Sequence, residues 1–201
     1  PVPEFDRAPA AGATFTQKPL TNRPGRGAVA ERLAEILRVD HAGELAAVHI
    51  YRGQQAVFSR VPGKEKILSD LEEMEAHEHV HLNRFNDLLT EHRVRPTVFT
   101  PLWRLMAFGL GAGTALIGDK AAHACTEAVE SVIEKHYAEQ IAELQDRDPA
   151  LTAELRQFRD DELAHRDKAI EDGAHEATAY PLLTAVIQAG CKVAIRLSEK
   201  L

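Results

Sequence analysis

Residues 78–81 read EHVH and residues 162–165 read ELAH, and these two segments decide the fold. Each is a Glu-x-x-His pair inside strongly helical sequence, and the chain contains no third pair of this kind. Positions i and i+3 of an α-helix lie on one face, so each pair can direct a carboxylate oxygen and an imidazole nitrogen at the same point. That donor set suits iron, manganese or zinc. A single pair would fit a solvated face rich in Glu and His equally well.

A lone glutamate precedes each pair at a similar distance. Glu44 lies 34 residues before the glutamate of the first pair, and Glu130 lies 32 residues before that of the second. The midpoints fall beside Pro62-Gly63 and within residues 146–149 (DRDP), which are typical turns between antiparallel helices. Folding each half at its turn brings the lone glutamate level with the Glu-x-x-His pair of the next helix.

Two such helix-turn-helix units, packed together, place four carboxylates and two imidazoles at one height. This is the ligand set of the ferritin-like di-iron carboxylate proteins. The predicted metal ligands are Glu44, Glu78, His81, Glu130, Glu162 and His165. Two divalent irons would balance four ionised glutamates, whereas repulsion and desolvation without metal would raise the pKa of several of these carboxyls. The spacing therefore predicts an all-α, ferritin-like four-helix bundle with a two-iron site.

Length and composition limit the alternatives. The chain has 201 residues, which suits one domain with a large core, and its net charge of −7 argues against nucleic acid as the main partner. Residues 1–27 contain five prolines and no periodicity, so they are predicted to form a flexible arm before a di-iron domain at 28–201. Cys125 and Cys191 lie in apolar helical sequence, which favours buried free thiols over a disulfide and fits a reducing compartment.

Hydrophobic periodicity places six helices along the chain. The four that carry the predicted ligands are expected at about residues 28–59, 65–91, 119–145 and 149–172. An apolar crossover at 102–118 and a C-terminal amphipathic helix at 181–200 complete the set.

The third ligand helix offers a choice of glutamates on one side, namely Glu127, Glu130 and Glu134, and the 32-residue spacing selects Glu130. Tyr137 follows Glu130 by two helical turns on the same face, so its hydroxyl is either satisfied within the core or placed beside the metal. His136 directly precedes Tyr137 and lies one position round the helix from that face.

Other polar residues near the pairs are assigned to the outside of the ligand layer. On the second helix, His77 and His79 lie away from the apolar stripe that carries Glu78 and His81. They are therefore expected to be solvated or to contact the ligands only from outside. Outer-face charges are expected at Asp160, Asp161, Arg166 and Asp167, although one of these acids can orient a ligating imidazole.

Residues 102–118 (LWRLMAFGLGAGTALIG) form the most apolar stretch. At roughly 17 residues it is short for a bilayer span, and Arg104 would cost about 2.5–3.5 kcal/mol at a membrane centre. Two alternatives remain, a buried crossover helix and a helix lying in the membrane interface. The second is favoured because few polar faces are left by Trp103, Leu105, Met106, Phe108 and Leu110. Close backbone approach is permitted by Gly109, Gly111, Ala112 and Gly113.

The last helix carries a basic stripe beside an apolar one. Lys192, Arg196 and Lys200 follow one another at intervals of four residues. Such a stripe is able to meet anionic lipid headgroups or a phosphate-bearing cofactor, although ordinary solvated cations would give the same pattern.

Six segments of the chain carry a more specific signal: RVDHAGE (38–44), RVRPT (93–97), FGLGAGTALIG (108–118), AVES (128–131), DELAH (161–165) and IQAGCKVAIRLSEKL (187–201). Together they resemble the demethoxyubiquinone hydroxylase family of ubiquinone biosynthesis, over about residue 38 to the C-terminus. All six predicted ligands occupy the family's metal-ligand positions, and His136 and Tyr137 match its His-Tyr pair after the third ligand.

The resemblance implies a membrane-peripheral, non-haem di-iron monooxygenase that hydroxylates a polyprenylated methoxy-methyl-benzoquinol with O2. It implies catalytic roles for His136 and Tyr137, NADH as electron donor and a lipid-binding accessory protein as partner. The resemblance places such an enzyme on the matrix side of the mitochondrial inner membrane or on the cytoplasmic side of a bacterial inner membrane. The sequence leaves tail length, reductant and oligomeric state open, a homodimer included.

Two other functions fit parts of the same pattern. A rubrerythrin-like or ferritin-like protein that handles peroxide or iron would use the same six ligands, but it would need no apolar membrane surface. A helical lipid-binding or assembly module would carry a metal with a purely structural role.

Overall fold

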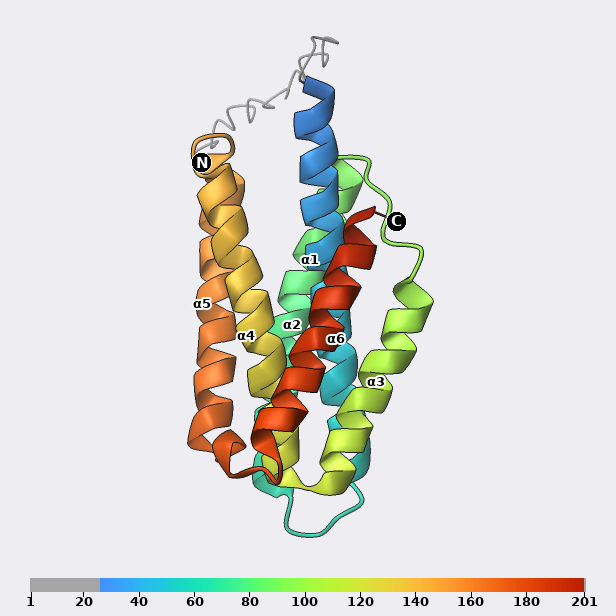
Figure 1. The fold of residues 1–201 in the computed structure, drawn as a ribbon, viewed down its shortest axis with the longest axis vertical. Coiled ribbons are helices and arrows are strands. Elements are labelled where there is room, and N and C mark those ends of the chain that lie inside the picture. Colours follow the sequence, from blue (N-terminus) through green and yellow to red (C-terminus); the bar gives the residue numbers. More distant parts are fainter. Residues whose placement is uncertain (1–25, 201) are drawn as a thin grey trace, which may run out of the picture.

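The computed structural model describes residues 26–200, and the regular structure in that range is entirely helical. The helices are α1 (Arg26–Phe58), α2 (Glu65–Glu91), α3 (Thr100–Ile117), α4 (Asp119–Leu144), α5 (Pro149–Glu171) and α6 (Tyr180–Lys200), with the short 3-10 helix η1 (Ala174–Glu176) before α6 (Figure 1). The six predicted helices are confirmed to within two residues at each end, and η1 was not predicted. The predicted arm lies outside the described residues, except that Arg26 and Gly27 already belong to α1.

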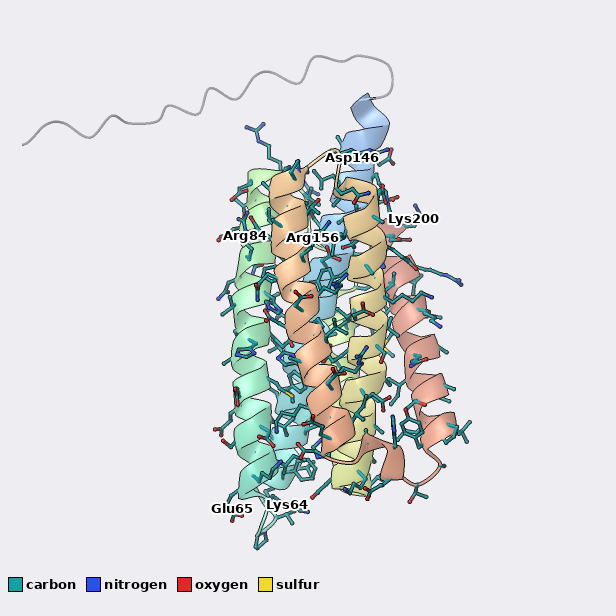
Figure 2. All side chains as sticks on the ribbon, turned by 90° about the vertical axis from the view of Figure 1, so that its left-hand side faces the viewer. Lys64, Glu65, Arg84, Asp146, Arg156 and Lys200 are labelled. Carbon is teal, nitrogen blue, oxygen red and sulfur yellow. The ribbon has the colours of Figure 1, made fainter. Side chains whose placement is uncertain are left out.

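Helices α1, α2, α4 and α5 form the four-helix bundle that the ligand spacing predicts. The α1–α2 turn, marked by Lys64 and Glu65, and the α4–α5 turn, marked by Asp146, lie at opposite ends of the bundle (Figure 2). The two helix-turn-helix units are therefore antiparallel, with α3 as the crossover between them (Figure 1).

Local sequence explains where these turns fall. Gly63 adopts a φ of 79° in the first turn, a conformation that glycine reaches without steric cost. In the second turn, the Asp148 side chain accepts a hydrogen bond of 3.0 Å from the backbone nitrogen of Leu151 and caps α5, and Pro149 occupies the first turn of that helix.

Two apolar clusters fill the bundle on either side of a polar layer. One includes Leu37, Phe85 and Leu155, which are fully buried, and the other includes Phe58, Leu71 and Met74. On α1, α2 and α4 the predicted ligands fall between residues of these two clusters, and on α5 they follow the residues of the first cluster. The core therefore supplies a dry, rigid surrounding for the polar layer.

Helix α3 packs closely against α1. A Cβ atom added at Gly111 would lie 2.0 Å from the carbonyl oxygen of Ile50, and one added at Gly53 would lie 2.2 Å from that of Phe108. The expected close approach is thus confirmed at Gly111, whereas Gly109 and Gly113 have no such neighbour within 4 Å.

The outer faces of α3 and α6 expose most of the large apolar side chains that are exposed in the described residues. They are Leu102, Leu105, Met106, Phe108, Leu116, Ile117, Leu182, Val186, Val193 and Leu197. One face of α3 is therefore buried against the bundle and the other is apolar and exposed, and its position in a membrane interface stays a prediction. None of the helices within residues 26–200 combines the length and the apolar character that a membrane crossing requires.

One expectation about these helices is wrong. Trp103 does not belong to the outer apolar face, since it is 8% exposed and its indole nitrogen donates a hydrogen bond of 3.0 Å to the Ser198 hydroxyl.

Candidate metal centre

The six predicted ligand side chains meet in the polar layer of the bundle. They form two overlapping groups, Glu44, Glu78, His81 and Glu162 in one, and Glu78, Glu130, Glu162 and His165 in the other. Within each group, one ligand atom from every residue lies within 4.8 Å of the others, and all six side chains are buried. Each group is able to hold one metal ion, and Glu78 and Glu162 belong to both.

Both imidazoles direct Nδ1 into the layer. His81 Nδ1 lies 3.3 Å from Glu44 Oε2 and 3.2 Å from Glu162 Oε1. His165 Nδ1 lies 3.1 Å from Glu78 Oε1 and 3.5 Å from Glu162 Oε2. The i, i+3 spacing within each pair is what places these atoms on a common face.

The outer ring nitrogens have partners of different chemistry. His81 Nε2 lies 3.1 Å from Asp161 Oδ2, so Asp161 is the acid that orients an imidazole, as the sequence allowed. His165 Nε2 lies 3.1 Å from Nδ1 of His77, which therefore contacts the layer from outside. A hydrogen bond to the outer nitrogen fixes the orientation of a histidine and keeps the inner nitrogen available to a metal.

Two tyrosines connect the helix-turn-helix units across the layer. The Tyr137 hydroxyl donates a short hydrogen bond to Glu44 Oε1, and the Tyr51 hydroxyl donates one of 2.6 Å to Glu130 Oε1. Tyr137 therefore lies beside the ligand layer, the second of the two alternatives for its hydroxyl. Tyr51 was missed, although it follows Glu44 by the same seven residues that separate Tyr137 from Glu130.

The polar layer fits a bound cation because many of its buried atoms lack a hydrogen-bond partner. Among the six side chains these atoms are Glu44 Oε2, both oxygens of Glu78, His81 Nδ1, Glu130 Oε2, both oxygens of Glu162 and His165 Nδ1. Buried polar atoms without partners are costly, and buried charges are normally paired or bound to metal. The orphaned atoms all belong to residue types that iron accepts.

The pKa values of the layer show the strain of packing these groups together. Burial raises the pKa of Glu78 to about 7, and burial with the charge of neighbouring carboxylates raises the pKa of Glu130 and Glu162. Burial alone would lower the pKa of His165, but the Glu162 and Glu78 carboxylates outweigh it and raise that pKa to about 11. Glu44 differs, since contact with His81 outweighs burial and lowers its pKa. Without metal, the layer therefore holds protons that cations can replace.

The choice among the glutamates of α4 agrees with the geometry. Glu130 lies in the layer, while Glu127 accepts hydrogen bonds from the Tyr180 hydroxyl at 2.6 Å and from His175 Nε2 at 3.2 Å. Glu127 thereby ties α4 to the segment that begins α6. Glu134 is half-buried and belongs to neither group.

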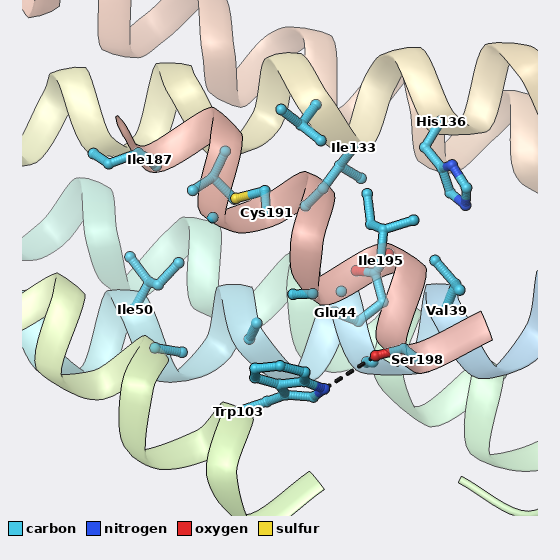
Figure 3. Close-up of a pocket in the computed structure, with 18 of the residues that line it drawn as sticks. Val39, Glu44, Ile50, Trp103, Ile133, His136, Ile187, Cys191, Ile195 and Ser198 are labelled. Atoms are coloured by element: carbon cyan, nitrogen blue, oxygen red, sulfur yellow. Dashed lines mark hydrogen bonds between the residues drawn. The ribbon is translucent and has the colours of Figure 1, made fainter. Parts of the chain in front are cut away.

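An apolar cavity of about 310 Å³ lies between α1, α3, α4 and α6 and reaches the polar layer at Glu44 and Tyr137 (Figure 3). His136 lines this cavity rather than the layer itself. Cys191 also lines it, and Cys125 is buried nearby. Both are free thiols as predicted, but Cys191 is only partly buried. Met106 and Val186 line the cavity and are also exposed, so the cavity opens between α3 and α6.

The predicted basic stripe divides into two parts. Lys200 forms an ion pair of 2.5 Å with Glu35 on α1. Lys192 and Arg196 instead border a surface groove with Lys135 and Arg32, which runs beside His136. Binding of a phosphate group or a lipid headgroup by these residues stays a prediction.

Comparisons with known proteins agree on one family. The family model described as "Ubiquinone biosynthesis protein COQ7" matches residues 31–198. The chain is 49% identical over 175 residues to a Bos taurus protein named "NADPH-dependent 3-demethoxyubiquinone 3-hydroxylase, mitochondrial", covering 85% of this chain and 79% of the bovine one.

Relatives outside animals are similar over comparable lengths. The "3-demethoxyubiquinol 3-hydroxylase" of Rhodospirillum rubrum is 44% identical over 191 residues, covering 95% of this chain and 87% of the relative. The "5-demethoxyubiquinone hydroxylase, mitochondrial" of Saccharomyces cerevisiae is 42% identical over 185 residues, with 84% and 78% covered. The chain therefore belongs to the COQ7 family of ubiquinone biosynthesis proteins, whose relatives named here are demethoxyubiquinone hydroxylases.

Proposed function

We propose that this chain is a di-iron monooxygenase that uses O2 to hydroxylate a polyprenylated methoxy-methyl-benzoquinol, demethoxyubiquinol, in ubiquinone biosynthesis. The observation that carries the proposal is the buried layer of carboxylates and imidazoles that opens, at Glu44 and Tyr137, onto an apolar cavity. The names of the bovine, bacterial and yeast relatives support the substrate and the reaction.

In this proposal each of the two overlapping groups holds one iron. Bound iron supplies the activation of O2, which carboxylates and imidazoles do not provide by themselves. Tyr51 and Tyr137 each occupy one oxygen of Glu130 and Glu44 and leave the other oxygen for the metal. Asp161 and His77 hold the outer nitrogens of the two imidazoles, so the inner nitrogens face the ions.

The cavity accounts for the substrate. Its walls are almost entirely apolar, so they exclude water and accept an alkylated ring beside Glu44. An isoprenoid tail leaves a bilayer only at about 0.8 kcal/mol per methylene, so the protein must reach its substrate at the membrane. The exposed apolar faces of α3 and α6, on both sides of the cavity mouth, suit a peripheral position in the membrane interface.

The electron donor in the proposal is a reduced nicotinamide nucleotide. The sequence resemblance suggested NADH, whereas the name of the bovine relative specifies NADPH and those of the bacterial and yeast relatives specify neither. The candidate residues for the phosphates are Lys192, Arg196 and Lys135, which border the surface groove. Arg32 in the same groove is already paired with Glu35, Glu143 and Glu199. A peripheral location at a mitochondrial or bacterial inner membrane, a lipid-binding accessory partner and a homodimer remain expectations of the proposal.

The test is reconstitution with ferrous iron without O2, followed by isotopically labelled O2 and a short-tailed demethoxyquinol. The proposal expects a product that carries one labelled oxygen atom. In a control with unlabelled O2, the mass of the product should be lower by the difference between the two oxygen isotopes. A protein that consumes peroxide or oxidises iron at the same rate with and without the quinol, and yields no hydroxylated ring, would support the ferritin-like or rubrerythrin-like alternative instead.

A further inference from the structure

The apolar cavity has few polar side-chain atoms on its wall, and most of them are already engaged. The Trp103 indole and the Tyr137 hydroxyl both donate hydrogen bonds, and Glu44 belongs to the metal layer. Two of the remaining lining residues each have a buried atom without a hydrogen-bond partner among the described residues, Oδ2 of Asp40 and Nε2 of His136.

Asp40 is held firmly in place. It is 4% exposed, and its Oδ1 accepts a hydrogen bond of 2.7 Å from Gln140 Nε2, which is itself buried. Burial, reinforced by the charge of Glu44 and only partly opposed by Gln140, keeps the pKa of Asp40 well above its usual range. The raised pKa favours the protonated carboxyl, which is able to donate a hydrogen bond.

The Asp40 and His136 side chains are not hydrogen-bonded to each other. His136 Nε2 lies 4.0 Å from Asp40 Oδ1, which is too long for a hydrogen bond. Leaving a buried polar atom unpaired is unfavourable, so a polar atom of a ligand in the cavity would relieve both.

The position of Asp40 relates this ligand atom to the metal layer. Asp40 lies one helical turn before Glu44 on α1, and both line the cavity. Residues four apart on a helix have Cβ atoms about 5–6 Å from each other. A six-membered ring that contacts Asp40 through one oxygen therefore extends toward Glu44 and Tyr137.

We propose that Asp40, oriented by Gln140 and facing the cavity with His136, donates the hydrogen bond that positions the quinol or quinone ring through one of its ring oxygens. The inference rests on the proposed function for its substrate class. It adds a substrate-binding residue that holds the ring at a fixed distance from the metal layer.

The experiment measures quinone binding without turnover. Trp103 is the single tryptophan of the chain and lines the cavity, so quenching of its fluorescence reports a quinone bound there. A tail-less methoxy-methyl-benzoquinone is titrated into the full chain without O2 or reductant. Asp40→Leu should bind it about tenfold more weakly, the usual worth of one hydrogen bond. Asp40→Asn should bind almost as tightly as wild type, because an amide can accept from Gln140 and still donate to the ring.

Two controls separate this role from general damage. Gln54→Leu also alters a buried polar side chain of α1 that has an unpartnered oxygen, but Gln54 does not line the cavity, so its quinone affinity should be unchanged. A methoxytoluene, which lacks the quinone oxygens, should bind wild type and Asp40→Leu with the same affinity, measured by its competition with the quinone.

Unchanged quinone binding by Asp40→Leu would overturn the inference and leave Asp40 with a bound water or a purely structural role. Equal losses in Asp40→Asn and Asp40→Leu would overturn it too. If Asp40→Leu does not fold, Gln140→Met, which frees the Asp40 carboxyl to rotate, replaces it with the same expectation of weaker binding, and an unchanged affinity again refutes the inference. Failure of the proposed function appears separately, as wild-type protein that binds the quinone but yields no hydroxylated product.

Discussion

The apolar stripe on α6 gives a sharp test of membrane association. Val193 is 54% exposed and lies on this stripe with Leu182, Val186 and Leu197, without lining the cavity. Val80 on α2 is 64% exposed and belongs to a helix that packs against α1 and α5 rather than α3 or α6. Val193→Ser and Val80→Ser therefore make the same chemical change at similar exposure on two different faces.

The expected size of the effect follows from the exposed area. Complete burial of a valine side chain is worth about 1.5–3 kcal/mol, so burying the exposed half of Val193 in a membrane contributes about 0.8–1.6 kcal/mol. Loss of that contribution should weaken liposome binding by Val193→Ser about 4- to 14-fold. Val80→Ser should bind like wild type.

The assay is flotation with liposomes that contain anionic and neutral lipids, with circular dichroism as the check on folding. Equal weakening by both substitutions would show that exposed apolar area acts without regard to position. No weakening by Val193→Ser would show that the stripe of α6 does not lie in the membrane. Either result would refute the proposed orientation of α3 and α6.

Three further outcomes are expected. Glu130→Ala should lose bound iron and hydroxylation, whereas Glu127→Ala should keep its iron because that carboxylate contacts α6 and η1 residues instead. Elemental analysis measures the iron, and equal losses would contradict the assignment of Glu130 as the metal ligand of α4. Gly111→Ala should lower the melting temperature by forcing α3 away from α1, whereas Gly113→Ala, which meets no atom within 4 Å, should be neutral or gain about 0.5–1 kcal/mol. The metal-free chain should lose stability as the pH rises from about 4.5 to 7. Folded Glu78 keeps its proton to about pH 7 while the unfolded chain releases it near 4.5, so the folded state binds more protons in that interval. A melting temperature of the metal-free chain that stays constant or rises over that range would contradict this.

Much of the fold could be predicted because its signals are local. Pro62-Gly63 and the segment that ends at Pro149 break the helices, and the apolar period on either side defines their length. The packing of α3 was harder, since a segment that is apolar all round does not show which face is buried. That face is set by the contact of Gly53 and Gly111 with the facing backbones, and Gly53 lies in another helix.

Part of the candidate site could likewise be predicted from the sequence, and part could not. The ligand layer follows from helical spacing within and between two repeated units, and Tyr51 could have been found from the same spacing. The partners of the imidazoles depend on how α2 and α5 are rotated against each other, which sequence does not encode in any short pattern, so Asp161 stayed one candidate among three acids. The contact of Asp40 with Gln140 joins residues 100 positions apart and has no periodic signal at all.

The most direct test of the metal centre is the iron content of the chain. After reconstitution with ferrous iron without O2 and removal of unbound metal, elemental analysis should find two irons per chain, one for each of the two overlapping groups. Both should be lost when Glu78 or Glu162, which belong to both groups, is replaced by alanine. One iron or none in carefully reconstituted wild-type protein would contradict the di-iron site.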